Sequence, residues 1–184
     1  ELDLFKSGSY GYHTYRIPAL VTTGKGTLLA FAEGRKESRS DSGNIDVVLR
    51  RSGDGGRTWS DPQVVADNGD DTIGNPTPVV LRKSGTILLL LTGNPAKAGE
   101  AQFMIGAPGG TRTVWITSSR DDGKTWTPLR DITSMAKSPE WGWYATGPGN
   151  GIQLKDGRIV IPCDHTVKPS KTLHSHVIFS DDGG

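Results

Sequence analysis

The sequence predicts an all-β protein, and three observations support this. First, short segments rich in β-branched residues recur along the chain, namely TYRIPALVT, IDVVLRR, PTPVVLRK, TVWITSS and HVIFS. Second, turns built from Gly, Asp, Asn or Lys-Gly bound these segments. Third, the sequence shows no sustained helical periodicity, and its 25 glycines and 11 prolines among 184 residues predict many turns.

Composition excludes several classes of function. The formal net charge is +1, from 21 basic and 20 acidic residues, so bulk charge attracts neither nucleic acid nor an acidic membrane surface. The single cysteine, Cys163, excludes an internal disulfide framework and a CxxC metal or redox site. No apolar run approaches the ~18 residues of a membrane-spanning helix. The four histidines lack zinc-ligand spacing, so we expect neither a metal nor a cofactor.

One nine-residue motif occurs twice and begins a third time. RSGDGGRTW at residues 51–59 and SSRDDGKTW at residues 118–126 both fit the pattern S-x-D-x-G-x-T-W, and Ser180, Asp182 and Gly184 match its first half. We call this motif the Asp box. Upstream of each copy stands a tight turn followed by an apolar strand, in GKGTLLAF, KSGTILLL and KDGRIVIP. The chain therefore contains three copies of one unit.

Units of about four strands with a recurrent tryptophan are typical of β-propeller blades. A β-sandwich is the main alternative, but it gives no reason for the same turn and box to recur in one order. Turn chemistry explains the fixed positions of the box, because its Asp accepts backbone N–H bonds and its glycines allow positive φ. We therefore expect the boxes to build the fold, with Trp59 and Trp126 buried between blades.

Functional residues are then expected where the units differ. Arg16 lies in YRIP, whose proline marks an edge or innermost strand because it cannot donate a ladder hydrogen bond. Arg35 ends AFAEGR, and the polar loop at residues 36–44 carries Asp41. A loop of this length with a carboxylate is a plausible site element, although a solvated loop is the common alternative.

These residues together resemble the exo-sialidases, or neuraminidases, which are six-bladed propellers. The resemblance rests on YRIP, AFAEGR, an Asp loop leading to LRRS, and the repeated boxes, in this order. It covers the chain from about Tyr15 to Gly184. It implies that residues 1–184 form the N-terminal part of one propeller domain and hold about three of its blades.

The resemblance also assigns roles to particular residues. Arg16 corresponds to the first of three arginines that bind the sialic acid carboxylate, and Arg35 to a further arginine at the floor of the site. Asp41 falls where the family places its acid/base aspartate, and Asp46 in the following strand is the competitor. A planar guanidinium binds a carboxylate bidentately, and a carboxylic acid can protonate a glycosidic oxygen, so these residue types fit the chemistry.

Weaker matches extend the predicted substrate-binding set. Asn75 in GNPTPV stands where relatives have an active-site Asn or Asp, or it caps a turn. Glu100, in the long insertion at residues 94–111, resembles a glutamate near the sugar's polar groups. Tyr144, in EWGWYATG, is expected to line the pocket together with Trp141 and Trp143, unless these aromatic side chains belong to the core.

The resemblance implies an exo-α-sialidase that removes terminal sialic acid from glycoproteins, glycolipids and oligosaccharides with retention. In this family the tyrosine nucleophile, its glutamate and the other two carboxylate-binding arginines lie beyond the matched segment, so we expect the 184 residues alone to be inactive and to need the C-terminal half. A noncatalytic propeller that binds glycans or proteins is the alternative. We expect a secreted or cell-surface protein, with a lysosomal or intracellular one left open.

Overall fold

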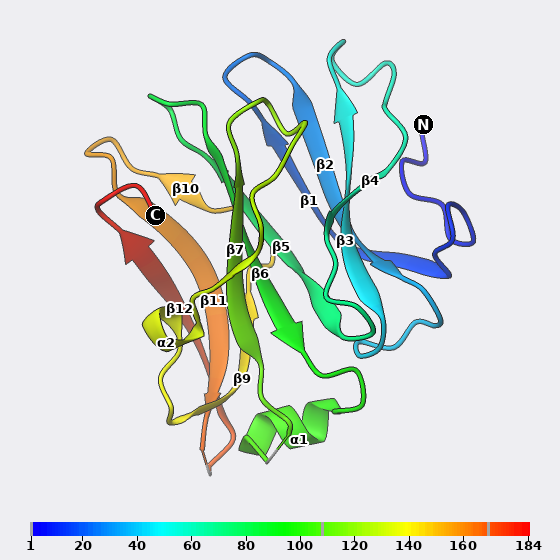
Figure 1. Ribbon diagram of the computed structural model, residues 1–184. Coiled ribbons are helices and arrows are strands. Elements are labelled where there is room, and N and C mark those ends of the chain that lie inside the picture. Colours follow the sequence, from blue (N-terminus) through cyan, green and yellow to red (C-terminus); the bar gives the residue numbers. More distant parts are fainter. Residues whose placement is uncertain (1, 108, 169) are drawn as a thin grey trace.

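The computed structural model describes residues 2–107, 109–168 and 170–184 and forms three successive antiparallel units of four strands, of which the first two are joined into one sheet. In Figure 1 the middle unit, in green, lies between the first, in blue to cyan, and the third, in yellow to red. We call them blades one, two and three. Among the described residues, helix is confined to α1 (Glu100–Ile105) and α2 (Thr133–Ala136). Neither helix has the length and apolar character needed to cross a membrane.

Blade one consists of four strands that pair antiparallel in chain order. They are β1 (Thr14–Thr22), β2 (Leu28–Arg35), β3 (Ile45–Ser52) and β4 (Gln63–Ala66). Strands β2 and β3 are buried over most of their length because they lie inside the sheet and are covered on both faces.

Blade two repeats this order, with an insertion before its third strand. Its strands are β5 (Thr72–Val80), β6 (Ile87–Asn94), β7 (Thr113–Ser119) and β8 (Arg130–Asp131). The insertion between β6 and β7 contains α1, a helix of six residues in a chain whose predicted all-β architecture is confirmed. One parallel pair, Ile45 with Thr72, joins blade two to blade one.

Blade three has an interrupted inner strand. Both β9 (Trp141–Thr146) and β10 (Ile152–Gln153) pair with β11 (Ile159–Val167), which in turn pairs with β12 (Thr172–Ser180). The two short strands therefore act as one inner strand with a break between them.

All three inner strands bend at a positive-φ residue that precedes a proline. Ile17 has φ 52°, Asn75 has φ 51° and Gly147 has φ 78°, and each is followed by proline. The β1 register shifts at this point, as does the β5 register. A β-branched residue such as Ile17 rarely adopts this conformation, and strain of this kind concentrates at functional sites.

Apolar side chains fill the spaces between the blades. The strand ILLLLTGN alternates, so that Ile87, Leu89 and Leu91 belong to the core shared with blade one. Leu88 and Leu90 belong to the core shared with blade three. Burial of each such side chain contributes about 1.5–3 kcal/mol, which explains why an uninterrupted apolar run occupies the middle strand.

The two ends of the blades carry different residues. At one end Arg35 pairs with Thr14 and with Ile45, so β1 and β3 begin there. We call it the arginine end. At the other end Ser52 pairs with Leu28, and the first Asp box follows. The other two boxes likewise follow the last residues of β7 and β12. We call this the box end.

The first two boxes have the same pattern of hydrogen bonds. In box one Asp54 Oδ1 accepts from Ser52 Oγ at 2.8 Å and from Thr58 N at 2.9 Å. The corresponding distances from Asp121 in box two are also 2.8 and 2.9 Å. The bonds from Thr58 and Ser52 lower the pKa of Asp54 to about 2. Each Asp is thus satisfied within its own turn, as the sequence predicts.

Candidate active site

Arg16, Arg35 and Asp41 meet at the arginine end. Asp41 Oδ1 lies 2.8 Å from Arg16 Nη1 and 2.6 Å from Arg35 Nη2. The side chains of Arg16 and Asp41 are 47% and 63% exposed, whereas that of Arg35 is 3% exposed. One carboxylate oxygen therefore contacts two guanidinium groups at the surface of the sheet.

The folding of the loop at residues 36–44 explains how Asp41 reaches both arginines. Lys36 N donates to Asn44 O at 3.1 Å, which closes the loop onto the sheet. Arg35 Nη1 donates to Arg39 O at 2.7 Å, and this bond holds the middle of the loop over β2. Because β1 pairs directly with β2, Asp41 also lies within reach of Arg16.

Glu33 holds Arg35 in place and was not identified from the sequence. Its Oε2 accepts from Arg35 Nε at 3.1 Å and from Arg35 Nη2 at 2.7 Å. Its Oε1 accepts from Asn75 N at 2.9 Å, which ties blade two to blade one. Gly74 allows this approach, since a Cβ there would collide with the Glu33 carboxylate. A charged residue inside a buried strand, two positions before an arginine, is the sequence signal that identifies it.

Asn75 joins all three blades. Besides its bond to Glu33, its carbonyl oxygen accepts from Thr146 Oγ1 at 2.8 Å. Its Oδ1 accepts from Arg112 Nη1 at 3.4 Å. The structure therefore brings Asn75 close to the arginines, and its role in contacting substrate stays a prediction.

Arg112 is a third arginine near this cluster and was also missed. It is 4% exposed, and its guanidinium carbon lies 3.7 Å from the Trp143 ring centroid and 5.1 Å from that of Phe103. Its Nε has no partner among the described residues. Burial lowers the pKa of Arg112 to about 10, against the opposing effect of nearby carboxylates that include Glu33 and Asp41, so it stays charged at neutral pH.

Glu100 lies at the rim rather than in the cluster. It is exposed in the first turn of α1 and borders a depression of about 390 Å³ together with Met104, Trp143 and Asp164. Phe103 of the same helix is buried against Arg112, so packing explains that residue. Pro108 of the insertion lies outside the described residues.

Tyr144 does not line the site, and the expectation that it does is corrected. Its side chain is fully buried, and its hydroxyl donates to Cys163 Sγ at 3.2 Å. Burial, followed by the neighbouring Cys163, raises the pKa of this tyrosine. Alternation along β9 instead directs Trp143 toward Arg112, where its Nε1 also donates to Asp164 Oδ1 at 2.6 Å.

The competitor Asp46 is buried away from the cluster. It is 1% exposed, accepts from the Tyr12 hydroxyl at 2.7 Å and lies 3.1 Å from Lys36 Nζ. Asp41 is thus the aspartate that an external molecule can reach. Within the described part of the chain, no three His, Cys, Asp or Glu residues form a group that could hold a metal ion.

The arrangement suits recognition of an anionic group beside an exposed carboxyl. Two arginines, one fixed by Glu33 and one at the surface, already bind the carboxylate of Asp41. Charge-assisted bonds of this kind are short and directional. A carboxyl at the same position can exchange a proton with a bound molecule.

Comparisons with known proteins show which family this chain resembles. A family model described as a BNR repeat-like domain matches residues 26–184. An exo-alpha-sialidase of Aspergillus fumigatus is 39% identical over 88% of this chain and 46% of its own length. A sialidase of Bacteroides fragilis is 32% identical over 92% of this chain and 34% of its own length.

Solved structures give the same result. The Hadza microbial sialidase Hz136 aligns with a TM-score of 0.88 and 30% identity, over 97% of this chain and 37% of that one. A leech intramolecular trans-sialidase aligns with a TM-score of 0.84 over 100% of this chain and 44% of its own, and at 15% identity it supports the fold alone. The chain spans less than half the length of these relatives.

Proposed function

The chain belongs to the sialidase family, and from that premise we propose that it is the N-terminal part of an exo-α-sialidase. The substrate would be a glycoprotein, glycolipid or oligosaccharide with a terminal sialic acid, and the anomeric configuration would be retained. The observation that carries the proposal is the contact of Arg16 and Arg35 with the single carboxylate of Asp41. It supports the proposal because two guanidinium groups here contact one carboxylate, and a carboxylate is the charged group of sialic acid.

Substrate binding would change the surroundings of Asp41. A substrate carboxylate that takes over both guanidinium groups leaves Asp41 without its cationic partners. This favours the protonated carboxyl that a general acid needs. Asp41 would then protonate the leaving glycosidic oxygen and afterwards accept a proton from the attacking water.

Glu33 acts as a positioning residue in this scheme. It neutralises Arg35 and fixes its side chain, so that Nη2, which bonds Glu33, stays beside the exposed carboxyl of Asp41. The nucleophile and the remaining carboxylate-binding arginines would come from the rest of the propeller. The 184 residues alone are therefore expected to lack turnover.

The proposal is tested in the full-length protein with two substrates, a sialyl-galactoside and an aryl sialoside whose phenol has a low pKa. Asp41→Ala should slow turnover of the sialyl-galactoside by roughly 10²–10⁴, the usual contribution of general acid–base catalysis. The aryl sialoside needs little protonation, so its glycosylation should be much less impaired. Asp46→Asn is the matched control for a general change of charge.

Two outcomes would contradict the proposal. Equal losses on both substrates, with folding intact and chemistry rate-limiting, would remove Asp41 from the acid role. A full-length protein that binds sialosides but never cleaves them would favour the noncatalytic glycan-binding propeller instead.

A further inference from the structure

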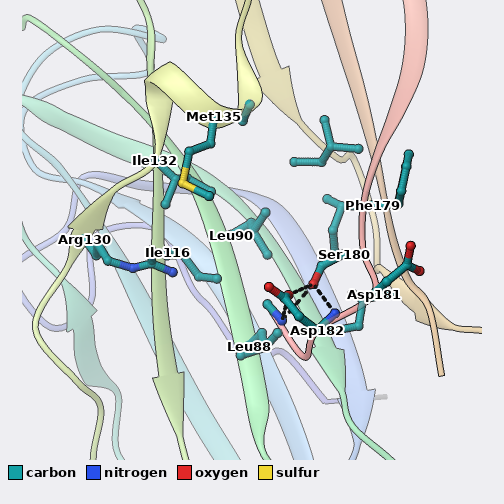
Figure 2. A pocket seen from close by; sticks show the side chains of 15 residues that line it. Leu88, Leu90, Ile116, Arg130, Ile132, Met135, Phe179, Ser180, Asp181 and Asp182 are labelled. Atoms are coloured by element: carbon teal, nitrogen blue, oxygen red, sulfur yellow. Dashed lines mark hydrogen bonds between the residues drawn. The ribbon is translucent and has the colours of Figure 1, made fainter.

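The face of blade three that packs on blade two changes in chemical character along its length. Its apolar part lies at the box end, where Figure 2 shows Leu88, Leu90 and Ile116 of blade two around a pocket of about 500 Å³. Ile159 and Ile161 of β11 line the same pocket. Toward the arginine end of this face, histidine side chains replace the aliphatic ones.

Alternation along two paired strands brings these histidines together. His165 follows Ile161 and Cys163 on the buried face of β11. It pairs with His174 of β12, and His176 stands two residues further along that strand. His165 is buried, His176 is half-buried and His174 is exposed. Three imidazole rings therefore gather on one face of blade three.

His165 and His176, which we call the histidine pair, share one hydrogen bond. Their Nδ1 atoms lie 3.0 Å apart, so one ring must donate and the other must accept, which requires at least one neutral ring. The Nε2 atom of His176 is buried and has no partner among the described residues. A first proton can be shared across the Nδ1–Nδ1 bond, whereas a second proton leaves two donors facing each other.

The histidine pair packs on Trp141, the first residue of β9. The Trp141 ring stacks on that of His165, with centroids 3.7 Å apart, and its centroid lies 4.8 Å from that of His176. Trp141 packs in turn against the core between blades two and three. The register between β9 and β11 shifts between His165 and Val167, so the backbone ladder is irregular here. Contacts between the rings therefore contribute to holding the start of β9 on β11.

The ionisable groups around the histidine pair offer little compensation for two protons. Asp164, next to His165 on β11, favours protonation of that ring, but its carboxylate already accepts from Trp143 Nε1. The ring of His174 stacks on that of His165, with centroids 5.2 Å apart, and adds a third titrating group. The remaining ionisable groups on the packed elements are Tyr144 and Cys163, which are neutral at pH 7, Glu100 beside His174, Lys137 and Lys168 beside Trp141, and Arg112 against Trp143.

Folding therefore favours the neutral histidine pair. Burial lowers the pKa of His165, and the charges of His176 and His174 lower it further. Burial also lowers the pKa of His176. In the unfolded chain both rings titrate near the ordinary value of about 6.5, so below that pH the unfolded chain binds more protons than the folded one. The stability that the pair contributes is complete near about pH 7.5 and is lost as pH falls below about 6.5.

We propose that the histidine pair is an acid-sensitive switch, which holds β9 on blade three at neutral pH and releases it when both rings are protonated. The released strand carries Trp143, whose ring centroid lies 3.7 Å from the guanidinium carbon of Arg112. The switch thereby reaches the candidate active site. The proposal stands on the packing of blade three and does not depend on the proposed catalysis.

The test measures hydrogen exchange of the full-length protein between about pH 7.5 and 5.5, corrected for intrinsic exchange rates. The open population of residues 141–146 should rise by up to about tenfold per pH unit for each proton taken up, while β2 and β3 stay protected. The double variant His165→Phe, His176→Phe keeps two rings against Trp141 but removes both titrations, so its opening should change little with pH. His13→Phe is the matched control, because His13 is exposed beside β1 and its loss should leave the acid response intact.

Three exchange results would overturn the proposal. They are equal protection of residues 141–146 at both ends of the pH range, an equal acid response in the double variant, and loss of protection over blade one at the same pH, which would mean global unfolding. Where the double variant does not fold, NMR titration of the unchanged protein decides. The His165 and His176 rings should titrate in two linked steps below His13, and a single ordinary step at about 6.5 for both rings would overturn the proposal.

Discussion

At the box end the same turn recurs from blade to blade, whereas at the arginine end the three blades contribute different side chains. The first two boxes have hydrogen-bond distances that agree to about 0.1 Å, and their Asp side chains are satisfied internally. The arginine end gathers Arg16, Arg35 and Asp41 from blade one with Asn75 and Arg112 from blade two. This difference indicates that the repeated residues stabilise the fold, and that the residues that differ between blades supply the chemistry.

Trp126 should give the largest effect on stability. Trp126→Ala removes an aromatic side chain from the core between two blades and should cost about 3 kcal/mol of unfolding free energy. Trp59→Ala is the matched control, because both tryptophans are partly buried but Trp59 packs in neither of the two interblade cores. It should cost less than about 1 kcal/mol in the 184-residue chain. Urea unfolding measures both, and equal losses would contradict the interblade role.

This pair also corrects an expectation from the sequence. Both tryptophans are predicted to be buried between blades; both are only partly buried, and Trp126 alone packs against an interblade core. The box motif is the same in both copies, but blade one has no preceding blade among the described residues against which Trp59 could pack. Whether the tryptophan of a box packs between blades depends on an adjacent blade, and the local motif carries no information about that blade.

Glu33 is an exception to the rule that residues at the box end stabilise the fold and residues at the arginine end supply the chemistry. It lies at the arginine end yet joins two blades through Arg35 and Asn75. Glu33→Gln should cost about 2 kcal/mol in urea unfolding, somewhat below the ~3–5 kcal/mol of a fully broken buried pair, because Asp41 still contacts Arg35. In the full-length protein it should also weaken substrate binding. Normal stability with normal activity would show that Glu33 neither ties the blades nor positions Arg35.

Arg16→Lys tests geometry at constant charge. A lysine keeps the positive charge but loses the planar pair of donors, so carboxylate-bearing ligands should bind more weakly by about 1–2 kcal/mol. Calorimetric titration of the full-length protein with a sialic acid analogue measures this loss. Affinity equal to that of the unchanged protein would mean that Arg16 does not contact the ligand carboxylate.

The smallest expected effect is a change in the pH dependence of stability, which Asp54 at the box end should cause. The folded-state pKa of Asp54, about 2, lies below the ordinary value because of its bonds to Thr58 and Ser52. Its contribution is therefore complete above about pH 4 and is lost as pH falls through about 2. Asp54→Asn should make the melting temperature less dependent on pH between about 2.5 and 5. An unchanged pH profile would argue against the box network as a source of stability.

The fold could be predicted because periodicity and turn chemistry are local properties. The strands and the boxes follow from patterns within a few residues, whereas the grouping of Arg16, Arg35 and Asp41 in one site follows from the resemblance to the exo-sialidases. Tyr144 and Arg112 could not be predicted in this way. Tyr144 lies in the core because alternation along β9 depends on where that strand begins, and Arg112 reaches Asn75 only through packing of the α1 insertion and Trp143.

Two aspartates, one at each end, test the central claim most directly. Asp41→Ala and Asp121→Ala are compared in the full-length protein for activity per folded molecule and for unfolding free energy. We predict that Asp41→Ala loses roughly 10²–10⁴ in turnover of a sialyl-galactoside with little change in stability. Asp121→Ala should lower stability and keep its activity per folded molecule. Loss of activity in folded Asp121→Ala, or full activity in Asp41→Ala, would contradict the account.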